Sequence, residues 1–505
     1  GVRVIDLTRY VSGPFCAALL ADMGAEVIKI EKPGAGEVSR KVAPYHNGIS
    51  LFFPPYNRNK KSVTADLRTP EGIAIAKRLI EKSDVLINNF RVGTLEKMGL
   101  DYETLKEINP GIIVVSITGF GQEGPMKDRL AFDGIISALS GVTRMENGHV
   151  ERSKGPIHDY MAAVYGAFGT VLALYEKKTT GRGQYLDVSM LACSSMIRTT
   201  SIADAALNGE KAAESGDDSA PFGYIRARDG WINFHAGTNR FYENLLGLID
   251  DPFLHQPQFI GSIPNRIVQA DELMEHIQRW GRDKSCDELE ALFTGAGIPS
   301  GVVETPQRMR DNVQLQYNHM IAEQDVEGID EPVPYMAFPI RMSNHEDLSY
   351  HRAPGVGEQN EEIYTGLLGM KPEEIAALRE KGVTPTLGIV RVGADPSDLS
   401  YEKGATKRAE LVGVDVKKFE LPADASKEDV LAVIDQVNAD DSIHGVLMFR
   451  PLPKHLKADQ TEICNRLDSK KDVDCMTDLS NAGVFEGRSD LGFAPCTPAA
   501  CMEIL

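Results

Sequence analysis

Short apolar segments alternate with helical segments from Val2 to Gly119, and this alternation is the feature that most constrains the fold. The first two apolar segments, 2–7 and 26–31, are rich in β-branched residues, and a helical run separates them. Helices at 71–83 and 102–108 then alternate with strands at 84–88 and 111–119. Alternation of this kind predicts a parallel β-sheet covered by helices, so the expected fold class is α/β.

The glycines near the second strand do not match a dinucleotide-binding motif. No Gly-x-Gly-x-x-Gly follows the first strand, and the sequence GAGE at 34–37 comes only after the second one. In a dinucleotide-binding fold the glycines lie between the first strand and its helix, where the backbone approaches a pyrophosphate. We therefore interpret 34–37 as a turn.

Length and charge narrow the possible classes of protein. A chain of 505 residues exceeds what one hydrophobic core usually organises, so two to four domains are expected. The formal charge of −19 argues against a general partner among nucleic acids or membrane surfaces, because both are polyanionic, although local basic pockets remain compatible with it. No apolar run approaches the ~18 residues that span a bilayer, so no membrane segment is expected.

The seven cysteines are scattered along the chain, without a CxxC pair, which favours a reduced, cytoplasmic setting over secretion. The spacing of the last two is poor for zinc, and no metal site is expected. The first residues indicate a strand rather than a targeting segment. Because the chain starts without Met and stops within a pattern, we expect a fragment. The cysteines are Cys16, Cys193, Cys286, Cys464, Cys475, Cys496 and Cys501.

Asp159 comes just before the clearest helical pattern in the chain. Met161, Phe168 and Tyr175 recur at helical spacing, and Gly181 can end the helix. Asp159 could simply be the N-cap of this helix, as aspartate often is. The same position also suits a covalent nucleophile, because amides at a helix start keep a carboxylate ionised and stabilise charge that develops in acyl transfer.

Long motifs from residue 1 to residue 383 resemble the class III CoA-transferases, which include formyl-CoA and crotonobetaine/carnitine CoA-transferases. The resemblance implies a Rossmann-like large domain, a smaller α+β domain, and an interlocked homodimer. It implies transfer of CoA from an acyl-CoA donor to a carboxylate acceptor through an aspartyl-CoA thioester on Asp159, without a metal or redox cofactor. The motifs include DLTRYVSGPFCAALLADMGAEVIKIEKPGAGEVSR, YNRNKKSVTADLRTPEG, NNFRVGTLEKMGLDYETLKEINP, SITGFGQEGP, PIHDYMAAVYGAFG, GIPSGVVETP and RAPGVGEQNEEI.

By resemblance, several N-terminal residues are expected to contact coenzyme A, which is a substrate here. Three of them are cations that could meet its phosphates, namely Lys32, Arg40 and Lys97. Val11 stands where formyl-CoA transferases have glutamine, and their glycine-rich loop is absent, so formyl transfer is not expected. The full set is Arg9, Tyr10, Val11, Ser12, Lys32, Arg40, Lys61, Asn89, Phe90 and Lys97.

An acyl-CoA racemase of the same superfamily is the alternative activity. Racemases of this kind use a histidine as a second acid/base, and the equivalent stretch here, AFDGIISALSG, has Phe132 at that place. Phenylalanine cannot move a proton, and His158 is the nearest substitute. Transferase activity is therefore favoured, and exchange of the α-proton with deuterated water would discriminate the two.

From Thr384 onward the chain resembles the N-terminal half of methylenetetrahydrofolate dehydrogenase/cyclohydrolase, on TPTLGIVRVGADPSDLSYEKG, HGVLMFRPLPKHL and KKDVDCMTDL. By this resemblance Tyr401 and Asp474 correspond to folate-site residues, so folate binding is a third possible function, with the front part as a scaffold. The catalytic lysine of that family is replaced by Ala405, and its glutamine by Phe449. The NAD(P)-binding half is missing, so little or no activity is expected of this tail.

These resemblances predict four parts of the chain: a large domain at 1–195, a small domain at 196–330, a return segment at 331–383 and a truncated folate-enzyme domain at 384–505. Residues 1–383 are expected to fold and dimerise alone. The string IAALREKGV at 375–383 matches the end of one family and the start of the other, and no flexible spacer follows it. We therefore expect this join to be an assembly chimera rather than a designed linker, the alternative being a genuine gene fusion.

Overall fold

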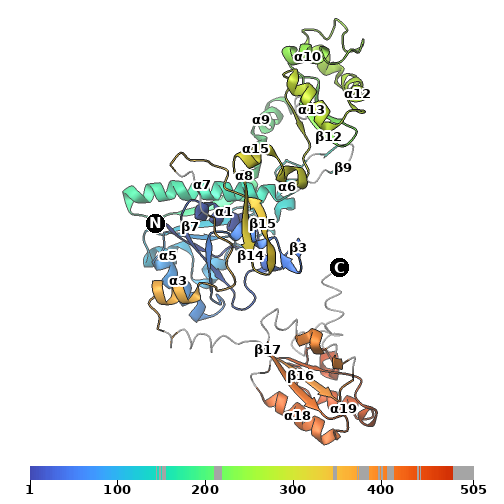
Figure 1. Ribbon diagram of the computed structural model, residues 1–505. Coiled ribbons are helices and arrows are strands. Elements are labelled where there is room, and N and C mark those ends of the chain that lie inside the picture. The colour runs from blue at the N-terminus through green and yellow to red at the C-terminus, as the bar shows by residue number, and fades with distance from the viewer. Residues whose placement is uncertain are drawn as a thin grey trace. The chain divides into compact units, whose positions relative to one another are not determined.

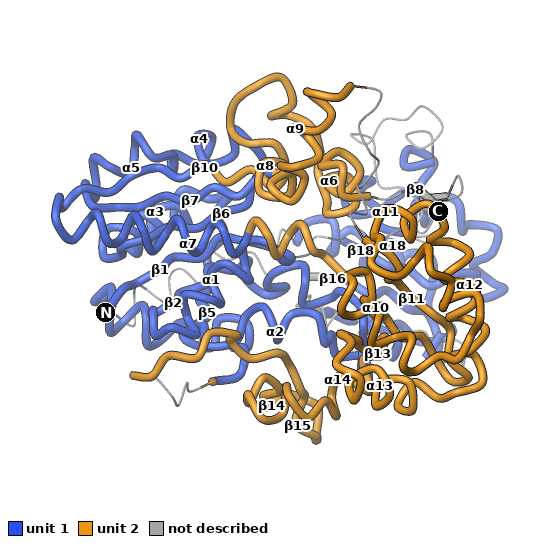
Figure 2. The backbone as a smooth tube through the Cα atoms, turned by 90° about the horizontal axis from the view of Figure 1, so that it is seen from above, with its two compact units in different colours: residues 1–118, 163–187, 351–505 blue, residues 119–162, 188–350 orange. Residues whose placement is uncertain are grey.

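The computed structural model divides the chain into two compact units, which are coloured separately in Figure 2. Unit 1 comprises residues 1–118, 163–187 and 351–505, and unit 2 comprises residues 119–162 and 188–350. The sequence-based domain boundaries stay predictions, and the units differ from them in assigning 119–162 to unit 2. The structure describes residues 1–143, 145–146, 149–150, 155–209, 219–344, 350–371, 374, 386–395, 398–399, 402–406, 415–440, 443 and 445–481.

A six-stranded sheet forms the centre of unit 1, in the order β10-β7-β6-β1-β2-β5. β1 pairs in parallel with both β2 and β6, β2 with β5, and β6 with β7, which confirms the predicted parallel α/β sheet. Its central strands are buried on both faces, as their continuous Val and Ile content predicts. The strands are β1 Arg3–Asp6, β2 Glu26–Glu31, β5 Lys60–Thr64, β6 Val85–Asn88, β7 Ile113–Thr118 and β10 Tyr185–Ser189.

Two helices of unit 1, α3 and α5, begin at side-chain caps. The side chain of Thr69 accepts a hydrogen bond from the Gly72 amide at the start of α3, and Asp101 does the same for Thr104 in α5. A two-stranded hairpin of β3 Tyr45–His46 and β4 Ile49–Ser50 follows the second strand. The helices are α1 Ser12–Asp22, η1 Val38–Lys41, α2 Phe53–Asn57, α3 Pro70–Glu81, α4 Thr94–Met98, α5 Tyr102–Ile108 and most of α7 Ile157–Thr180.

Residues 351–370 return to unit 1 and complete its edge. The amide of Ser62 on β5 donates to the side chain of Gln359, and the Thr64 amide donates to Asn360. The π-helix η4, Glu362–Leu367, follows, and Ile363 and Tyr364 join the core beneath the sheet. This segment is therefore part of the hydrophobic core of unit 1 and not a linker.

Unit 2 contains a three-stranded antiparallel sheet, β11-β12-β13, and a separate hairpin, β14-β15. The guanidinium of fully buried Arg266 donates to the carbonyls of Ala220, Phe259 and Gly237, and so ties three loops together. The elements are α6 Asp133–Leu139, β8 Met145–Glu146, β9 His149–Val150, α8 Met190–Ser195, η2 Met196–Arg198, α9 Thr199–Asn208, β11 Phe222–Arg226, β12 Trp231–His235, α10 Asn239–Leu246, α11 Ile263–Val268, α12 Ala270–Gly281, α13 Cys286–Gly295, β13 Ser300–Val302, α14 Pro306–Arg310, α15 Val313–Tyr317, β14 Ile321–Val326 and β15 Ile329–Met336.

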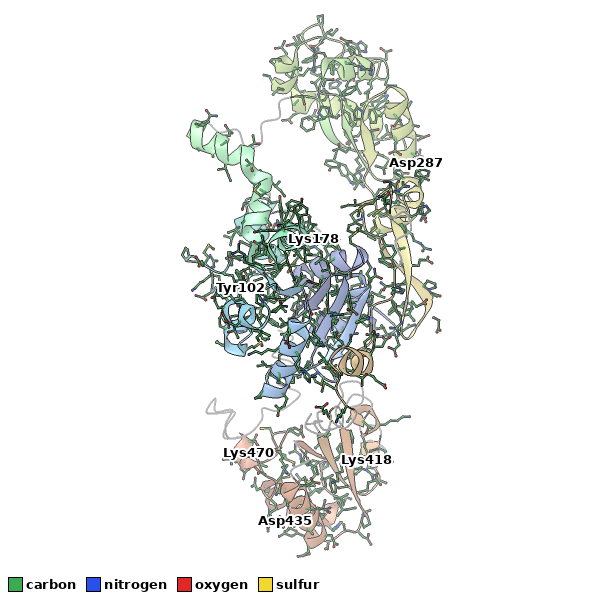
Figure 3. All side chains as sticks on the ribbon, turned by 90° about the vertical axis from the view of Figure 1, so that its left-hand side faces the viewer. Tyr102, Lys178, Asp287, Lys418, Asp435 and Lys470 are labelled. Atoms are coloured by element: carbon green, nitrogen blue, oxygen red, sulfur yellow. The ribbon has the colours of Figure 1, made fainter. Side chains whose placement is uncertain are left out.

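The tail has a sheet of its own (Figure 1). It also has a separate hydrophobic core. β16 lies between β17 and β18 and pairs in parallel with both. Lys418 on β17 and Asp435 on α18 lie on this part of the chain (Figure 3) and form ion pairs with Glu402 and Arg466 respectively. The elements are β16 Thr386–Val392, β17 Asp415–Leu421, α18 Lys427–Ala439, β18 Gly445–Met448, η5 Lys454–Leu456 and α19 Gln460–Asn465.

The long helix α7 corrects one expectation from the sequence. This helix of 24 residues is long and apolar enough to cross a membrane, judged by length and composition alone. No apolar segment of this length was expected from the sequence. Only 33% of its most apolar window is buried, and within unit 1 several large apolar side chains of α7 are exposed. These exposed side chains, which we call the α7 apolar face, are Val164, Tyr165, Phe168, Val171, Leu172 and Tyr175.

Candidate active site

The strand order of unit 1 places its topological switch point between β1 and β6. From β1 the chain continues to β2 on one side of it in the sheet, whereas the later strands β6 and β7 lie on the other side of β1. Ligands of open α/β sheets bind outside the carboxyl ends of the strands at such a point. Arg9 and Tyr10 follow β1, and Asn89 and Phe90 follow β6, so four of the predicted CoA contacts meet there.

Hydrogen bonds join these two loops directly. The Arg9 amide donates to Oδ1 of Asn89 at 2.9 Å, and Nδ2 of Asn89 donates to the Arg9 carbonyl at 2.7 Å. The guanidinium of Arg9 lies 5.2 Å from the centre of the Phe90 ring. The exposed Arg9 and Tyr10 are therefore held on a fixed backbone, as a binding loop requires.

The backbone between β1 and α1 is tightly constrained. Tyr10 has a φ of 64°, which is uncommon for a residue with a side chain and occurs often at functional sites. A Cβ on Gly13 would lie 2.4 Å from Cβ of Thr8, so only glycine allows this approach of helix to loop. Val11 and Ser12, also predicted CoA contacts, are buried at the start of α1.

A buried cluster of charges supports this loop from below. Nζ of Lys29 donates to the Thr8 carbonyl at 2.7 Å and lies 3.2 Å from Glu37, whose Oε1 accepts from the Tyr10 amide. Nζ of Lys60 lies 2.8 Å from Asp6. Burial by itself would raise the pKa of Asp6, but the charges of Lys29 and Lys60 outweigh it and lower this pKa to about 2.

Four other predicted CoA contacts are either paired with carboxylates of the protein or exposed. Arg40 forms a bidentate pair with buried Glu31 and lies 3.7 Å from the Phe53 ring centre, so its charge is already matched within the protein. Lys61 pairs with Glu26 and Glu362 near the amino ends of β5 and β2. Lys32 and Lys97 are exposed.

Asp159 lies in the first turn of α7, and the structure corrects its interpretation as the N-cap. The helix begins at Ile157, so Asp159 is already inside it. The carboxylate that satisfies the helix start belongs to Asp133 on α6, whose Oδ2 accepts the amides of His158 at 2.7 Å and Asp159 at 3.2 Å. The start of α7 is therefore capped by Asp133, and Asp159 lies within the first turn that this cap fixes.

His158 is fully buried, and its Nδ1 lies 2.9 Å from Oγ of Ser194 on α8. Its Nε2 has no hydrogen-bond partner among the residues that the structure describes. Phe132, at the place of the racemase histidine, is 69% exposed. Neither residue thus presents an exposed acid/base group beside Asp159.

The tail places one of its two predicted folate-site residues in an ion pair. Oδ2 of Asp474 accepts a hydrogen bond from the guanidinium of Arg450 at 2.9 Å. Phe449, the replacement for the family's glutamine, is 8% exposed. Tyr401 lies outside the described residues. Among the described residues, no three His, Cys, Asp or Glu side chains form a group that could hold a metal ion.

Three supporting features were missed by the sequence reasoning. Asp133 is 26 residues from Asp159, and nothing in the local pattern indicates that its carboxylate reaches the start of α7. Lys29 lies within the predicted strand 26–31, whereas no strand was predicted around Lys60, which lies in β5. In neither case does the local sequence show which carboxylate the lysine will contact. The only available signal was AFDG before a helix, since aspartate at such a position often contacts helix amides.

The comparisons with known proteins assign the chain to a family. Residues 1–360 match the model of CoA-transferase family III, and the chain belongs to this family. It is 33% identical to succinyl-CoA–D-citramalate CoA-transferase of Chloroflexus aurantiacus over 76% of this chain and 97% of the relative. It is 32% identical to human succinyl-CoA:glutarate CoA-transferase over 76% of this chain and 89% of the relative.

The solved structures agree with this assignment. A CaiB/BaiF family protein from Brucella suis has a TM-score of 0.65 and 29% identity, covering 73% of this chain and 98% of that one. Residues 360–474 match a second model, the catalytic domain of tetrahydrofolate dehydrogenase/cyclohydrolase. The resemblances expected from the sequence, including a folate-enzyme domain fused to a CoA-transferase, are confirmed.

Proposed function

We propose that this protein transfers CoA from an acyl-CoA donor to a carboxylate acceptor through covalent intermediates on Asp159. The observation that carries the proposal is the position of Asp159 in the first turn of α7, whose amides are capped by Asp133. A carboxylate in this position can be a nucleophile, because the helix start favours its ionised form.

The Asp159 carboxylate attacks the thioester carbonyl of the donor, which forms an acyl-aspartyl anhydride and releases CoA thiolate. The thiolate attacks the aspartyl carbonyl, so the donor carboxylate leaves and an aspartyl-CoA thioester remains. The acceptor carboxylate attacks this thioester, and the released thiolate then takes the acceptor acyl group from the second anhydride. Asp159 is regenerated, and no net proton or electron is consumed.

Succinyl-CoA is the proposed donor, and a dicarboxylate is the proposed acceptor. Both named relatives use succinyl-CoA, and their acceptors, D-citramalate and glutarate, each carry two carboxylates. A racemase is less well supported, because Phe132 replaces the second acid/base and His158 is buried against Ser194.

A second copy of this chain is the proposed partner. The α7 apolar face exposes Phe168 at 60% and Tyr175 at 74%, which is unusual for such large apolar side chains clustered on one helix. A homodimer that covers this face would remove it from water. The measurement is sedimentation equilibrium of the full chain, and a monomer at micromolar concentration would refute the dimer.

For the tail, we propose that the folate-enzyme domain lacks dehydrogenase and cyclohydrolase activity. Ala405 cannot transfer a proton, and the Arg450 guanidinium already neutralises Asp474. Folate binding is tested by equilibrium dialysis with tetrahydrofolate, and turnover of methylenetetrahydrofolate by the full chain would overturn the proposal.

The main proposal is tested by trapping the intermediate. The full chain is incubated with succinyl-CoA and then with hydroxylamine, which converts an activated aspartate into a hydroxamate. Peptide mass spectrometry is expected to find the hydroxamate on Asp159 only when the donor is present. Modification of a different residue, or none with an enzyme that turns over, would contradict the assignment.

A further inference from the structure

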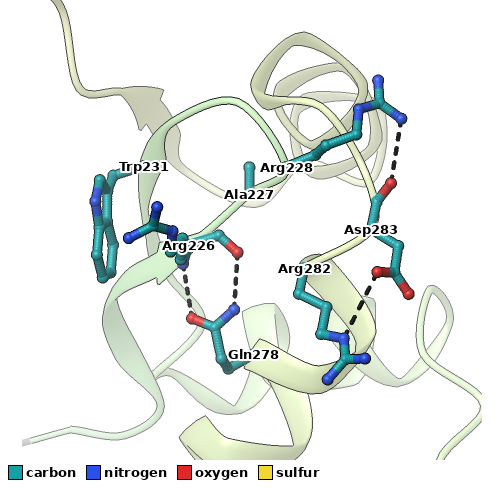
Figure 4. A pocket seen from close by; sticks show the side chains of 7 residues that line it. All are labelled: Arg226, Ala227, Arg228, Trp231, Gln278, Arg282 and Asp283. Atoms are coloured by element: carbon teal, nitrogen blue, oxygen red, sulfur yellow. Dashed lines mark hydrogen bonds and ion pairs between the residues drawn. The ribbon is translucent and has the colours of Figure 1, made fainter.

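An arginine-lined pocket lies in unit 2, and none of its lining residues is among those assigned above to CoA transfer. It has a volume of about 510 Å³ and is formed where β11 turns into β12 and where α12 ends (Figure 4). Arg226 and Trp231 form one wall, and Arg228, Arg282 and Asp283 form the other (Figure 4). The pocket is shallow and open to solvent, and most of its lining side chains are charged.

The pocket is positively charged within a strongly acidic chain. Among its lining residues, Asp283 is the one carboxylate beside three guanidiniums, and it lies 3.6 Å from Nε of Arg282. Arg228 lies 3.8 Å from Glu288, just outside the pocket. Asp229 is a further charge partner of Arg228. Among the described residues no carboxylate lies within 4.0 Å of the Arg226 guanidinium, so Arg226 is the arginine of this pocket that is left to bind an anion.

The wall that carries Arg226 is rigid. Oε1 of Gln278 accepts the Arg226 amide at 2.7 Å, and Nε2 of Gln278 donates to the Arg226 carbonyl at 2.8 Å. Arg226 is paired across the hairpin with Trp231, and its guanidinium lies 5.7 Å from the centre of the indole. The guanidinium thus lies over the indole ring, and Trp231 is 44% exposed to solvent.

We propose that this pocket binds a nucleotide, with its phosphates between the arginines and its base against Trp231. Guanidiniums bind phosphate through paired hydrogen bonds, and an indole offers a stacking surface for any base. A simple anion would bind the arginines without contacting the indole, whereas a nucleoside would stack on the indole without contacting the arginines. A free nucleotide and the nucleotide portion of CoA share this chemistry.

The fluorescence of Trp231 provides the test. The chain has two tryptophans, so the full-length Trp280→Phe variant reports on Trp231 alone. ADP is expected to quench this fluorescence saturably, and adenosine and inorganic diphosphate are expected to bind at least tenfold more weakly. Displacement of ADP by CoA assigns the site to the nucleotide portion of CoA, and failure of CoA to displace it assigns the site to a free nucleotide.

Variants in the same Trp280→Phe background separate the proposal from nonspecific quenching. Arg226→Gln with Arg282→Gln should weaken ADP binding at least tenfold, whereas Asp283→Asn should strengthen it severalfold. Arg240→Gln on α10, an exposed arginine outside the pocket, is the matched control and should change nothing. Absence of saturable quenching, equal binding of diphosphate or adenosine, or equal effects of Arg240→Gln would overturn the nucleotide site.

Discussion

Asp133 and Asp159 have different tasks at the start of α7, although both are carboxylates close to the same helix amides. Asp133 accepts two amide hydrogen bonds and so fixes the first turn, while Asp159 lies within that turn. Since the capping task is already filled, replacing the Asp159 side chain should affect chemistry far more than folding.

The first prediction is that Asp159→Asn lowers kcat for CoA transfer by at least ~1000-fold, because the amide is a poor nucleophile and cannot form the anhydride. The thermal midpoint should stay close to that of the wild type. Transfer is measured by chromatography of the CoA esters, with Asp271→Asn, an exposed aspartate on α12, as the control. Near-normal turnover of Asp159→Asn would rule out the nucleophile.

The second prediction concerns Asp133 as a positioning residue. Asp133→Ala removes two charge-assisted hydrogen bonds at the start of α7, which are worth roughly 1.5–3 kcal/mol each at most. We expect kcat to fall about 10- to 100-fold with little change in KM, because the nucleophile is displaced but donor binding is not. Asp133→Asn, which keeps one acceptor oxygen, should recover part of the loss. An unchanged kcat in Asp133→Ala would contradict this role.

At the scale of elements, the β1–α1 loop depends on strands that carry buried charge. Lys29 on β2 and Lys60 on β5 are both buried, and together they hold Asp6 at the end of β1. A buried ion cluster costs desolvation, and the partners must all be present to offset it. The loop that carries Arg9 and Tyr10 is thereby linked to the charge state of Asp6.

The third prediction follows from the pKa of Asp6, which is lowered from 3.8 to about 2 in the folded protein. A carboxyl group whose pKa is lowered by folding stabilises the folded protein fully at pH values above its pKa in the unfolded chain. This stabilisation is lost as the pH falls towards its pKa in the folded protein. The contribution is about 2 kcal/mol at about 1.4 kcal/mol per pKa unit. The advantage of wild type over Asp6→Asn in the free energy of unfolding should therefore narrow between pH 4 and pH 2.

Urea unfolding at several pH values measures this advantage, and Asp66→Asn is the matched control. The pKa of Asp66 is also lowered to about 2, chiefly by its hydrogen bond with Arg68, but the pair is partly exposed and so contributes less. A difference between wild type and Asp6→Asn that does not depend on pH in this range would refute the role of Asp6.

Local sequence patterns predicted helices and strands well, but they did not predict which distant residues contact one another. The helix expected at 102–108 is α5, Tyr102–Ile108, because a capping aspartate and a helical apolar face both lie within a few residues. The strands at 26–31 and 113–118 could likewise be predicted from short apolar runs in the sequence. By contrast, the contacts of Lys60 with Asp6 and of Asp133 with α7 join distant residues, and only the folded topology brings them together.

At the scale of the whole molecule, the two family matches meet at residue 360, but the hydrophobic core of unit 1 includes residues beyond this point. Ile363, Tyr364, Leu368 and Met370 belong to the core of unit 1, even though the folate-enzyme model begins before them. The shared string at 375–383 lies outside the described residues. Its helix pattern cannot pack against both modules at once, which is why we expect an assembly chimera.

The fourth prediction is therefore that single DNA reads across codons 340–420 diverge on either side of IAALREKGV. Long-read sequencing of the source DNA makes the measurement. Individual reads that continue through both modules would instead establish a gene fusion with a helical linker.

The fifth prediction is that residues 1–383 fold and transfer CoA without the tail, whereas residues 1–361 do not fold. The shorter chain loses four buried apolar side chains of the unit 1 core, namely Ile363, Tyr364, Leu368 and Met370. At roughly 1.5–3 kcal/mol each, their loss amounts to about 6–12 kcal/mol, which is as large as the whole stability of a typical domain. The tail has its own hydrophobic core, so the 1–383 chain keeps all four of these side chains. Circular dichroism and the transfer assay on both truncated chains make the test, and a folded, active 1–361 chain would show that the return segment is dispensable.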